Sequence, residues 1–461
     1  MVVQLFFIIV SLYAYSLAPS TMDMLFMAAM IATALLSITF NYYKAKDFDI
    51  KKQYLRHSVI FIISYIVVFY QYNIDYLLGF VEVNERTSLI WYDTTVVCKS
   101  LAMANIGLSS FMAGFQLYNK IGRQNIIAHN IYIYKNPQII VCLIYTLIVL
   151  YLIFVEKKYL INGYPNHIEQ GNIAYHLAIY IQGLLFSAFV INSCKLRSCN
   201  LKISVSKYLK ENKTLLVAVI LWVTLILLSG RRTEALKDIL LVLISFIYVC
   251  QYKFSIRELL VPIIGLSILM GLMALTRVDG TMSMDEAIKA LQESVSISPL
   301  TQELAFNVSS LHIALSNIPE NIGYNYGITF ALGFLVIVPG LQPFVISALS
   351  IPEALKGSAW LITEISDVDF GMGTSVIADI YVSFGIWGVI PIMFLWGVLL
   401  SFMEKNTFGF KVVTNPYIIA FSFSIYTTLI YVVRSSLVSV LDSISYTLIF
   451  IFLFSKRKKI C

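Results

Sequence analysis

Four arginines stand at the ends of apolar runs, where a phosphate-bearing ligand would meet fixed positive charge. They are Arg231 and Arg232 in the turn SGRRTE, Arg277 in LTRVDG, and Arg434 in the turn VVRSS. A guanidinium stays charged at any working pH and binds phosphate through paired hydrogen bonds. The set therefore predicts an anionic substrate. The alternative is that the arginines extend to lipid head groups, or that Arg232 and Arg434 pair with Glu234 and Asp442.

Two further residues are candidates for a general base. Asp379 lies a few positions into an apolar run, where an ionisable group is costly unless it faces a cavity. His312 has a side chain that accepts a proton near neutral pH. The alternatives are that Asp379 pairs with Arg434 and has no part in bond-making, and that His312 is structural. Other candidate bases in the same region are Glu364, Asp367 and Asp369.

The composition indicates the elements that must position these residues. Hydrophobic residues make up 59% and charged residues 13% of the 461-residue chain, which is too little charge for the surface of a soluble protein of this size. Many apolar runs reach the ~20 residues that a helix needs to cross a bilayer. The sequence predicts an all-α, polytopic membrane helix bundle with about 12 transmembrane helices. The predicted spans are 2–18, 21–41, 57–79, 94–116, 138–155, 172–193, 214–229, 235–250, 259–276, 376–402, 414–433 and 437–454.

The distribution of lysine and arginine predicts the orientation. With the N-terminus inside, the inside loops hold 22 of the 33 Lys and Arg residues and the outside loops hold nine, which is the bias of the positive-inside rule. Both termini are therefore expected in the cytoplasm. The four arginines fall outside, where the rule disfavours them, and this favours a functional role. The basic inside loops also account for the net charge of +7, so no nucleic-acid partner is expected.

One large external loop, residues 277–375, is predicted between the ninth and tenth spans. Its apolar run from Gly327 to Ser350 is interrupted by two prolines and a glycine, and counting it as a span would put the basic C-terminus outside. It is therefore expected to form a re-entrant or interface-lying hairpin. Amphipathic helices are predicted at 283–297 and 300–316. The predicted division is 1–276 with transmembrane helices 1–9, 277–375 as a large periplasmic loop, and 376–461 with helices 10–12 and a basic cytoplasmic tail.

Several other chemistries are disfavoured because their motifs are missing. The sequence has no Walker A sequence, no HExxH and no GxSxG with catalytic partners. Its six cysteines are scattered and lack metal-ligand spacing. We therefore expect neither a metal ion nor a cofactor.

The chain resembles the O-antigen and capsule repeat-unit polymerases of the Wzy type, which are GT-C-like membrane glycosyltransferases. Three features carry the resemblance, in this order: the SGRRTE turn after a span, an external loop containing GITFALGFLVIVPGLQPF, and GMGTSVIADIYVSFGIWG leading into the next span. Together they cover roughly residues 215–400. The family commonly has glutamate at the acidic position where this chain has Asp379.

The resemblance implies a substrate, undecaprenyl-diphosphate-linked oligosaccharide, and a place, the periplasmic face of the bacterial inner membrane. One lipid-linked molecule would donate its growing glycan to the nonreducing sugar of an incoming one. The four arginines would bind the diphosphate, and Asp379 or His312 would be the base. The expected partners are membrane lipids and a chain-length regulator. Two alternative functions remain, an O-antigen ligase and a lipid-linked oligosaccharide flippase.

Overall fold

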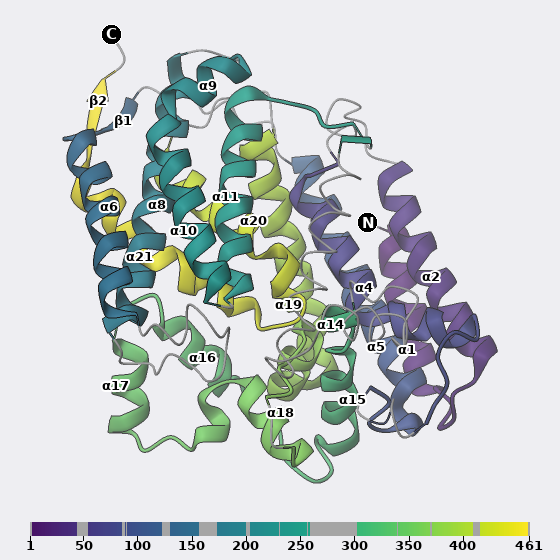
Figure 1. Cartoon of the computed structure of the whole chain (residues 1–461). Helices are drawn as coiled ribbons and strands as arrows, with labels where there is room; N and C mark the ends of the chain where they lie inside the picture. Colours follow the sequence, from purple (N-terminus) through teal and green to yellow (C-terminus); the bar gives the residue numbers. More distant parts are fainter. Residues whose placement is uncertain are drawn as a thin grey trace, which may run out of the picture. The chain divides into compact units, whose positions relative to one another are not determined.

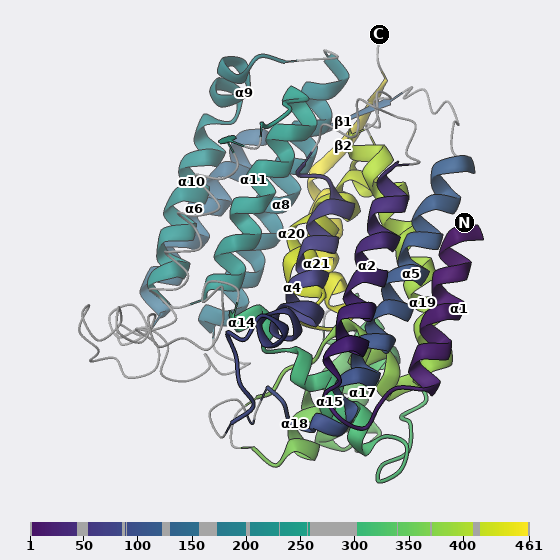
Figure 2. The same cartoon turned by 90° about the vertical axis from the view of Figure 1, so that its right-hand side faces the viewer.

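The structure is a computed structural model of two compact units, each built from helices (Figures 1 and 2). It describes residues 2–43, 54–84, 88, 90–121, 130–155, 173–199, 203–229, 231–255, 257–258, 302–338, 340–368, 371–408 and 415–459. Unit 1 comprises Met1–Arg123, Ser294–Met403 and Leu429–Leu441. Unit 2 comprises Gln124–Glu293, Glu404–Thr428 and Asp442–Cys461.

Unit 1 contains the N-terminal helices, which lie side by side in Figure 2. Helix α5 packs against both α1 and α2. Glycines bring α5 close to α19, since a Cβ at Gly114 would collide with the Phe394 carbonyl and one at Gly397 with the Phe111 carbonyl. Small residues allow such close backbone approach between membrane helices. The bounds are α1 Val2–Ser16, α2 Met24–Tyr43, α4 His57–Leu77, η2 Thr94–Val96, α5 Val97–Ile121 and α19 Val376–Phe408.

Short helices of unit 1 occupy the region predicted as the external loop. The helix predicted at 300–316 is divided by a turn at residues 306–307. The predicted hairpin forms two helices of eight residues each, joined through Gly340 at φ 82°. The helix predicted at 283–297 lies outside the described residues. The elements are α14 Gln302–Ala305, α15 Val308–Asn317, α16 Ile328–Leu335, α17 Leu341–Ala348, η3 Glu353–Lys356 and α18 Ser358–Ser366. A further short helix of unit 1, η4 Leu437–Ser439, lies outside residues 277–375.

Unit 2 is a bundle in which α8 packs against α6 and α11, and α11 against α10 (Figure 1). A small antiparallel ribbon, which the sequence did not predict, pairs Asn130–Tyr134 (β1) with Ser455–Lys459 (β2). The helices are α6 Pro137–Phe154, α8 Ile173–Cys199, α9 Val205–Glu211, α10 Lys213–Leu228 and α11 Arg232–Cys250. Helices α20 Pro416–Val432 and α21 Val440–Phe454 belong to this unit up to Thr428 and from Asp442 respectively.

The predicted all-α membrane architecture is confirmed in its coarse form. Every predicted span coincides with a helix except 259–276, which lies outside the described residues. Seven of the described helices are long and apolar enough to cross a membrane, or eight if the α9–α10 pair, bent by 74°, is one span. Helix α11 does not meet that criterion, because it carries four charged residues near its start.

Helix α19 is broken within the first third of its length. Gly385 has φ 64° and ψ −163°, so the backbone leaves the helical conformation there and resumes it afterwards. The first part, Val376–Phe384, carries Asp379. Positive φ is readily adopted only by glycine, so the glycine of the sequence SFGIWG permits the break.

Candidate functional site

The Asp379 carboxylate is buried in unit 1 among hydroxyl groups. The side chain is 1% exposed, and the hydroxyls of Ser358, at the start of α18, and Ser436, before η4, lie beside it. Its Oδ2 has no hydrogen-bond partner among the described residues, and neither has the Ser358 Oγ. A buried polar atom without a partner is costly, so this carboxylate retains an open hydrogen-bonding position.

Arg434 lies near the start of α19, the helix that carries Asp379. The Val376 amide donates to the Val433 carbonyl at 3.0 Å, which joins the first residue of α19 to the turn that contains Arg434. The polar side chains beside the Asp379 carboxylate are those of Ser358 and Ser436. The structure therefore brings the predicted base and one predicted phosphate ligand into one region of unit 1.

His312 is held on α15 by contacts at both ring nitrogens. Nδ1–H donates to the Ile90 carbonyl at 3.1 Å, and Nε2 lies 3.1 Å from the Ser100 Oγ. The ring stacks on Trp91 with centroids 6.2 Å apart. Burial lowers the pKa of His312 from 6.5 to about 4, and the Ile90 hydrogen bond and the Asp93 charge offset only part of this effect. These contacts favour the structural interpretation of a neutral ring.

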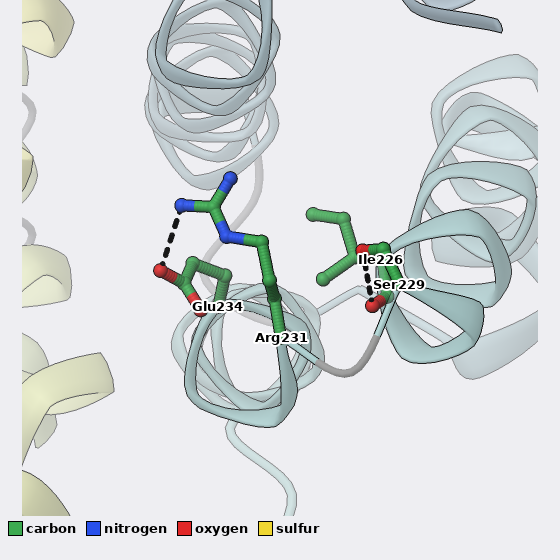
Figure 3. Close-up of polar contacts among 4 residues, drawn as sticks. All are labelled: Ile226, Ser229, Arg231 and Glu234. Carbon is green, nitrogen blue, oxygen red and sulfur yellow. Dashed lines mark hydrogen bonds and ion pairs between the residues drawn. The ribbon is translucent and has the colours of Figure 1, made fainter. Parts of the chain in front are cut away.

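The Arg231–Glu234 ion pair lies at the start of α11 in unit 2 (Figure 3). Nη2 is 2.9 Å from the Glu234 Oε1, and the two side chains are 15% and 29% exposed. The Arg231 amide donates to the Ile226 carbonyl at 3.1 Å, which closes the turn from α10 to α11. Three-residue spacing places both side chains on one face of the helix. Glu234 therefore pairs with Arg231, whereas the sequence suggested Arg232 as its partner.

Aromatic side chains surround this ion pair. The Arg231 guanidinium lies 5.9 Å from the centre of the Tyr175 ring on α8. Tyr151 of α6 lies within electrostatic reach of both charges, with its hydroxyl beside Ser229. The Nη1 of Arg231 is buried and has no partner among the described residues. The guanidinium thus keeps a donor available for a further acceptor, such as a phosphate oxygen.

A second buried carboxylate, Asp238, was not predicted as a functional residue. It lies on α11 one turn beyond Glu234 and is 0% exposed. The side chains of Gln182 on α8 and Trp222 on α10 lie beside it. Both of its oxygens lack a hydrogen-bond partner within the described part of the chain. The sequence could have indicated Asp238, because it is a charged residue inside the predicted span 235–250. The same reasoning identified Asp379 as a candidate.

The remaining predicted residues are less fully defined. The Arg232 side chain, Arg277 and Asp369 lie outside what the structure describes, and so does the Asp442 side chain. Glu364 and Asp367, the alternative bases, are exposed. Asp367 has a left-handed backbone conformation at φ 51° and ends α18.

Each unit therefore contains a buried group that is suited to chemistry. Unit 1 contains a carboxylate able to accept a proton, with an arginine near the start of its helix. Unit 2 contains an arginine with a free donor in an aromatic setting. A buried carboxylate can act as a base, and an arginine with an available donor can bind an anion.

A family model described as O-antigen polysaccharide polymerase Wzy matches residues 1–458 of this chain. No curated protein and no solved structure matches it.

Proposed function

This chain belongs to the O-antigen polysaccharide polymerase Wzy family, and we propose that it uses undecaprenyl-diphosphate-linked oligosaccharide as both donor and acceptor. The family match over nearly the whole chain is the observation that carries the function. Polymerisation of O-antigen repeat units and a location in the inner membrane follow from membership. The donor, the face of the membrane and the roles of individual residues are the proposal.

In the proposed reaction, a hydroxyl oxygen of the acceptor sugar bonds to the anomeric carbon of the donor glycan. The bond between that carbon and the diphosphate oxygen breaks, and the electron pair leaves with undecaprenyl diphosphate. The acceptor proton passes to the Asp379 carboxylate, whose buried Oδ2 has an open position. His312 is the weaker candidate, because both its nitrogens are already engaged.

The leaving diphosphate develops negative charge, which fixed positive charge stabilises most effectively in a low-dielectric site. We assign this role to Arg231, Arg232, Arg277 and Arg434. Among them, Arg231 has the best-supported geometry, since its Nη1 is buried without a partner. Its Glu234 contact holds the other end of the guanidinium in place.

The proposed topology has about 12 spans, both termini in the cytoplasm and residues 277–375 outside, as the positive-inside rule requires. The ribbon of β1 and β2 supports one part of it. It places the loop that carries Lys135 beside the C-terminal run from Lys456 to Lys459. The two segments that the charge count assigns to the inside are therefore on the same side.

The test is polymerisation by purified protein in liposomes without an ion gradient, given only undecaprenyl-diphosphate-linked repeat units. We expect a ladder of lengthening lipid-linked glycans. A flippase would yield no ladder, and its activity would instead appear as movement of the lipid between leaflets. Deletion in the cell separates the ligase alternative, because loss of a ligase leaves long polymer on undecaprenyl diphosphate. Loss of this protein should leave single transferred units.

A further inference from the structure

A second segment of unit 1 closes over the break in α19. Residues 324–329, with the sequence YNYGIT, lie against residues 381–385, with the sequence YVSFG. We call residues 324–329 the clasp. The two segments are more than fifty positions apart in the chain, and the sequence did not predict a contact between them.

The clasp replaces a hydrogen bond that the break removes. In a continuous helix the Val382 carbonyl would accept from the amide four residues later, beyond Gly385. In this structure it accepts from the Asn325 amide at 3.1 Å. A carbonyl freed by a broken helix is tolerated at membrane depth only when another group satisfies it.

The Asn325 side chain fixes the geometry of the clasp. Its Oδ1 accepts from the Gly327 amide at 3.0 Å, and its Nδ2 donates to the Thr329 Oγ1 at 3.2 Å. The Thr329 hydroxyl in turn lies 3.2 Å from the Ser383 Oγ. Asn325 is buried. A chain of hydrogen bonds therefore runs from Asn325 to the end of the half-helix that carries Asp379.

The two segments approach each other closely at two glycines. A Cβ at Gly385 would lie 2.9 Å from the Tyr324 hydroxyl, and Gly385 has a positive φ that disfavours any side chain. A Cβ at Gly327, where φ is 83°, would lie 2.6 Å from the Phe384 ring. Each segment has a glycine where the other approaches most closely. Substitution on either side would force the two apart.

The other end of the half-helix is held as well. The Val376 amide is bonded to the Val433 carbonyl, and the Ser310 hydroxyl donates to the Ser375 Oγ at 2.9 Å. Residues 374–383 are buried throughout. Asp379 thus sits midway along a short helix that is fixed at both ends by segments distant in sequence.

We propose that Asn325 is a positioning residue for Asp379, acting through the clasp and the broken end of α19. The inference rests on the proposed role of Asp379 as base. Its physical reason is that a proton acceptor must be held at hydrogen-bonding distance from the acceptor hydroxyl. A shift of about 1 Å in a reacting group costs on the order of 100-fold in rate.

The experiment compares Asn325→Ala, Asn325→Asp and the control Asn321→Ala in the liposome polymerisation assay. Asn321 is exposed and lies four residues before Asn325, outside the clasp. We expect Asn325→Ala to lower kcat at least ~10-fold and to leave KM for the lipid-linked unit within about twofold. Asn325→Asp keeps the acceptor for the Gly327 amide and should recover part of kcat. The control should match the unsubstituted protein.

A kcat for Asn325→Ala equal to that of the control overturns the proposal, as does a loss that Asn325→Asp does not lessen. If Asn325→Ala aggregates on extraction, Thr329→Val carries the same test, because it removes only the hydroxyl that links Asn325 to Ser383. Asp379→Asn is measured in parallel. Full activity of Asp379→Asn would contradict the proposed role of Asp379 as base. An inactive Asp379→Asn together with a fully active Asn325→Ala would contradict only the positioning role of Asn325.

Discussion

Asp379 of unit 1 and Asp238 of unit 2 are both buried aspartates, and the groups around the two carboxylates differ in kind. Asp379 lies beside the hydroxyls of Ser358 and Ser436, which can donate or accept a hydrogen bond. Asp238 lies beside the Gln182 amide and the Trp222 indole. The Trp222 indole can only donate a hydrogen bond. The atom of the Gln182 amide that is buried without a partner is its nitrogen, Nε2, which is also a donor.

This difference separates a group that can change its protonation state from one that serves as a fixed acceptor. A hydroxyl can donate to an ionised carboxylate or accept from a protonated one, so Ser358 and Ser436 are compatible with both forms of Asp379. N–H donors around Asp238 match only an acceptor oxygen. Burial alone would have assigned the two residues the same role.

The largest expected effect is that of Asp379→Asn compared with Asp238→Asn. Loss of a general base typically costs 10²–10⁴-fold in rate, so Asp379→Asn should leave surface glycan about one repeat long. Asp238→Asn keeps an acceptor oxygen for the N–H donors, and it removes a carboxylate that is costly to bury in the charged form. We expect it to lose far less activity than Asp379→Asn. Chain length on gels and the rate of the purified proteins are the measurements, and equal losses in both variants would erase the distinction.

The next effect concerns the Arg231–Glu234 pair. Removing one donor that stabilises developing charge typically costs on the order of 10²–10³-fold, so Arg231→Ala should abolish long chains while the protein still inserts into the membrane. Glu234→Gln removes a carboxylate that competes with the diphosphate, and it should bind undecaprenyl diphosphate more tightly. Binding is measured by titration of the purified protein.

Arg257→Ala is the matched control for this pair, because Arg257 is exposed and lies on the predicted inside. It should leave chain length unchanged. Long chains from Arg231→Ala would remove Arg231 from the diphosphate site, and weaker binding by Glu234→Gln would show that Glu234 helps to hold the ligand.

The smallest effect is a pH dependence of stability from His312. Its pKa is lowered by burial from 6.5 to about 4, so between these values the unfolded chain binds a proton that the folded chain does not. The stability from the neutral ring is present above pH 6.5 and is lost as the pH falls toward 4. The loss is on the order of 3 kcal/mol at 1.36 kcal/mol per pKa unit.

Thermal unfolding in detergent across pH 4–7 measures this term. His312→Gln should flatten the slope, and His176→Gln, at an exposed position, should leave it unchanged. An unaltered slope in His312→Gln would mean that another group produces the pH dependence.

Much of the fold was predictable because span length and apolarity are local properties. Helices formed at each predicted span that the structure describes. The ribbon of β1 and β2 was missed because it joins segments more than three hundred residues apart, and one of its strands is the basic sequence SKRKK. The division of 300–316 into two helices was missed because its apolar stripe continues across the turn.

The candidate site was predictable only residue by residue. Asp379 was identified from a charge within an apolar run, and the same criterion applied to 235–250 would have identified Asp238. The Arg231–Glu234 pair has the three-residue spacing of helix neighbours, so its formation was within reach of the sequence. The surroundings of Asp379 were not predictable, since Ser358 lies at the start of α18 and Ser436 lies just before η4.

The sequence by itself determined that this is a helical membrane protein of the polymerase family, and which charges stand where charge is costly. Hydrophobic length and composition act within a single segment, so no neighbour is needed to establish them. Only the tertiary structure decided that α19 breaks at Gly385 and that Asn325 satisfies the freed carbonyl. A glycine permits a broken helix, but the break becomes stable when a distant segment supplies the missing hydrogen bond. Which segment supplies that hydrogen bond depends on the packing of the tertiary structure.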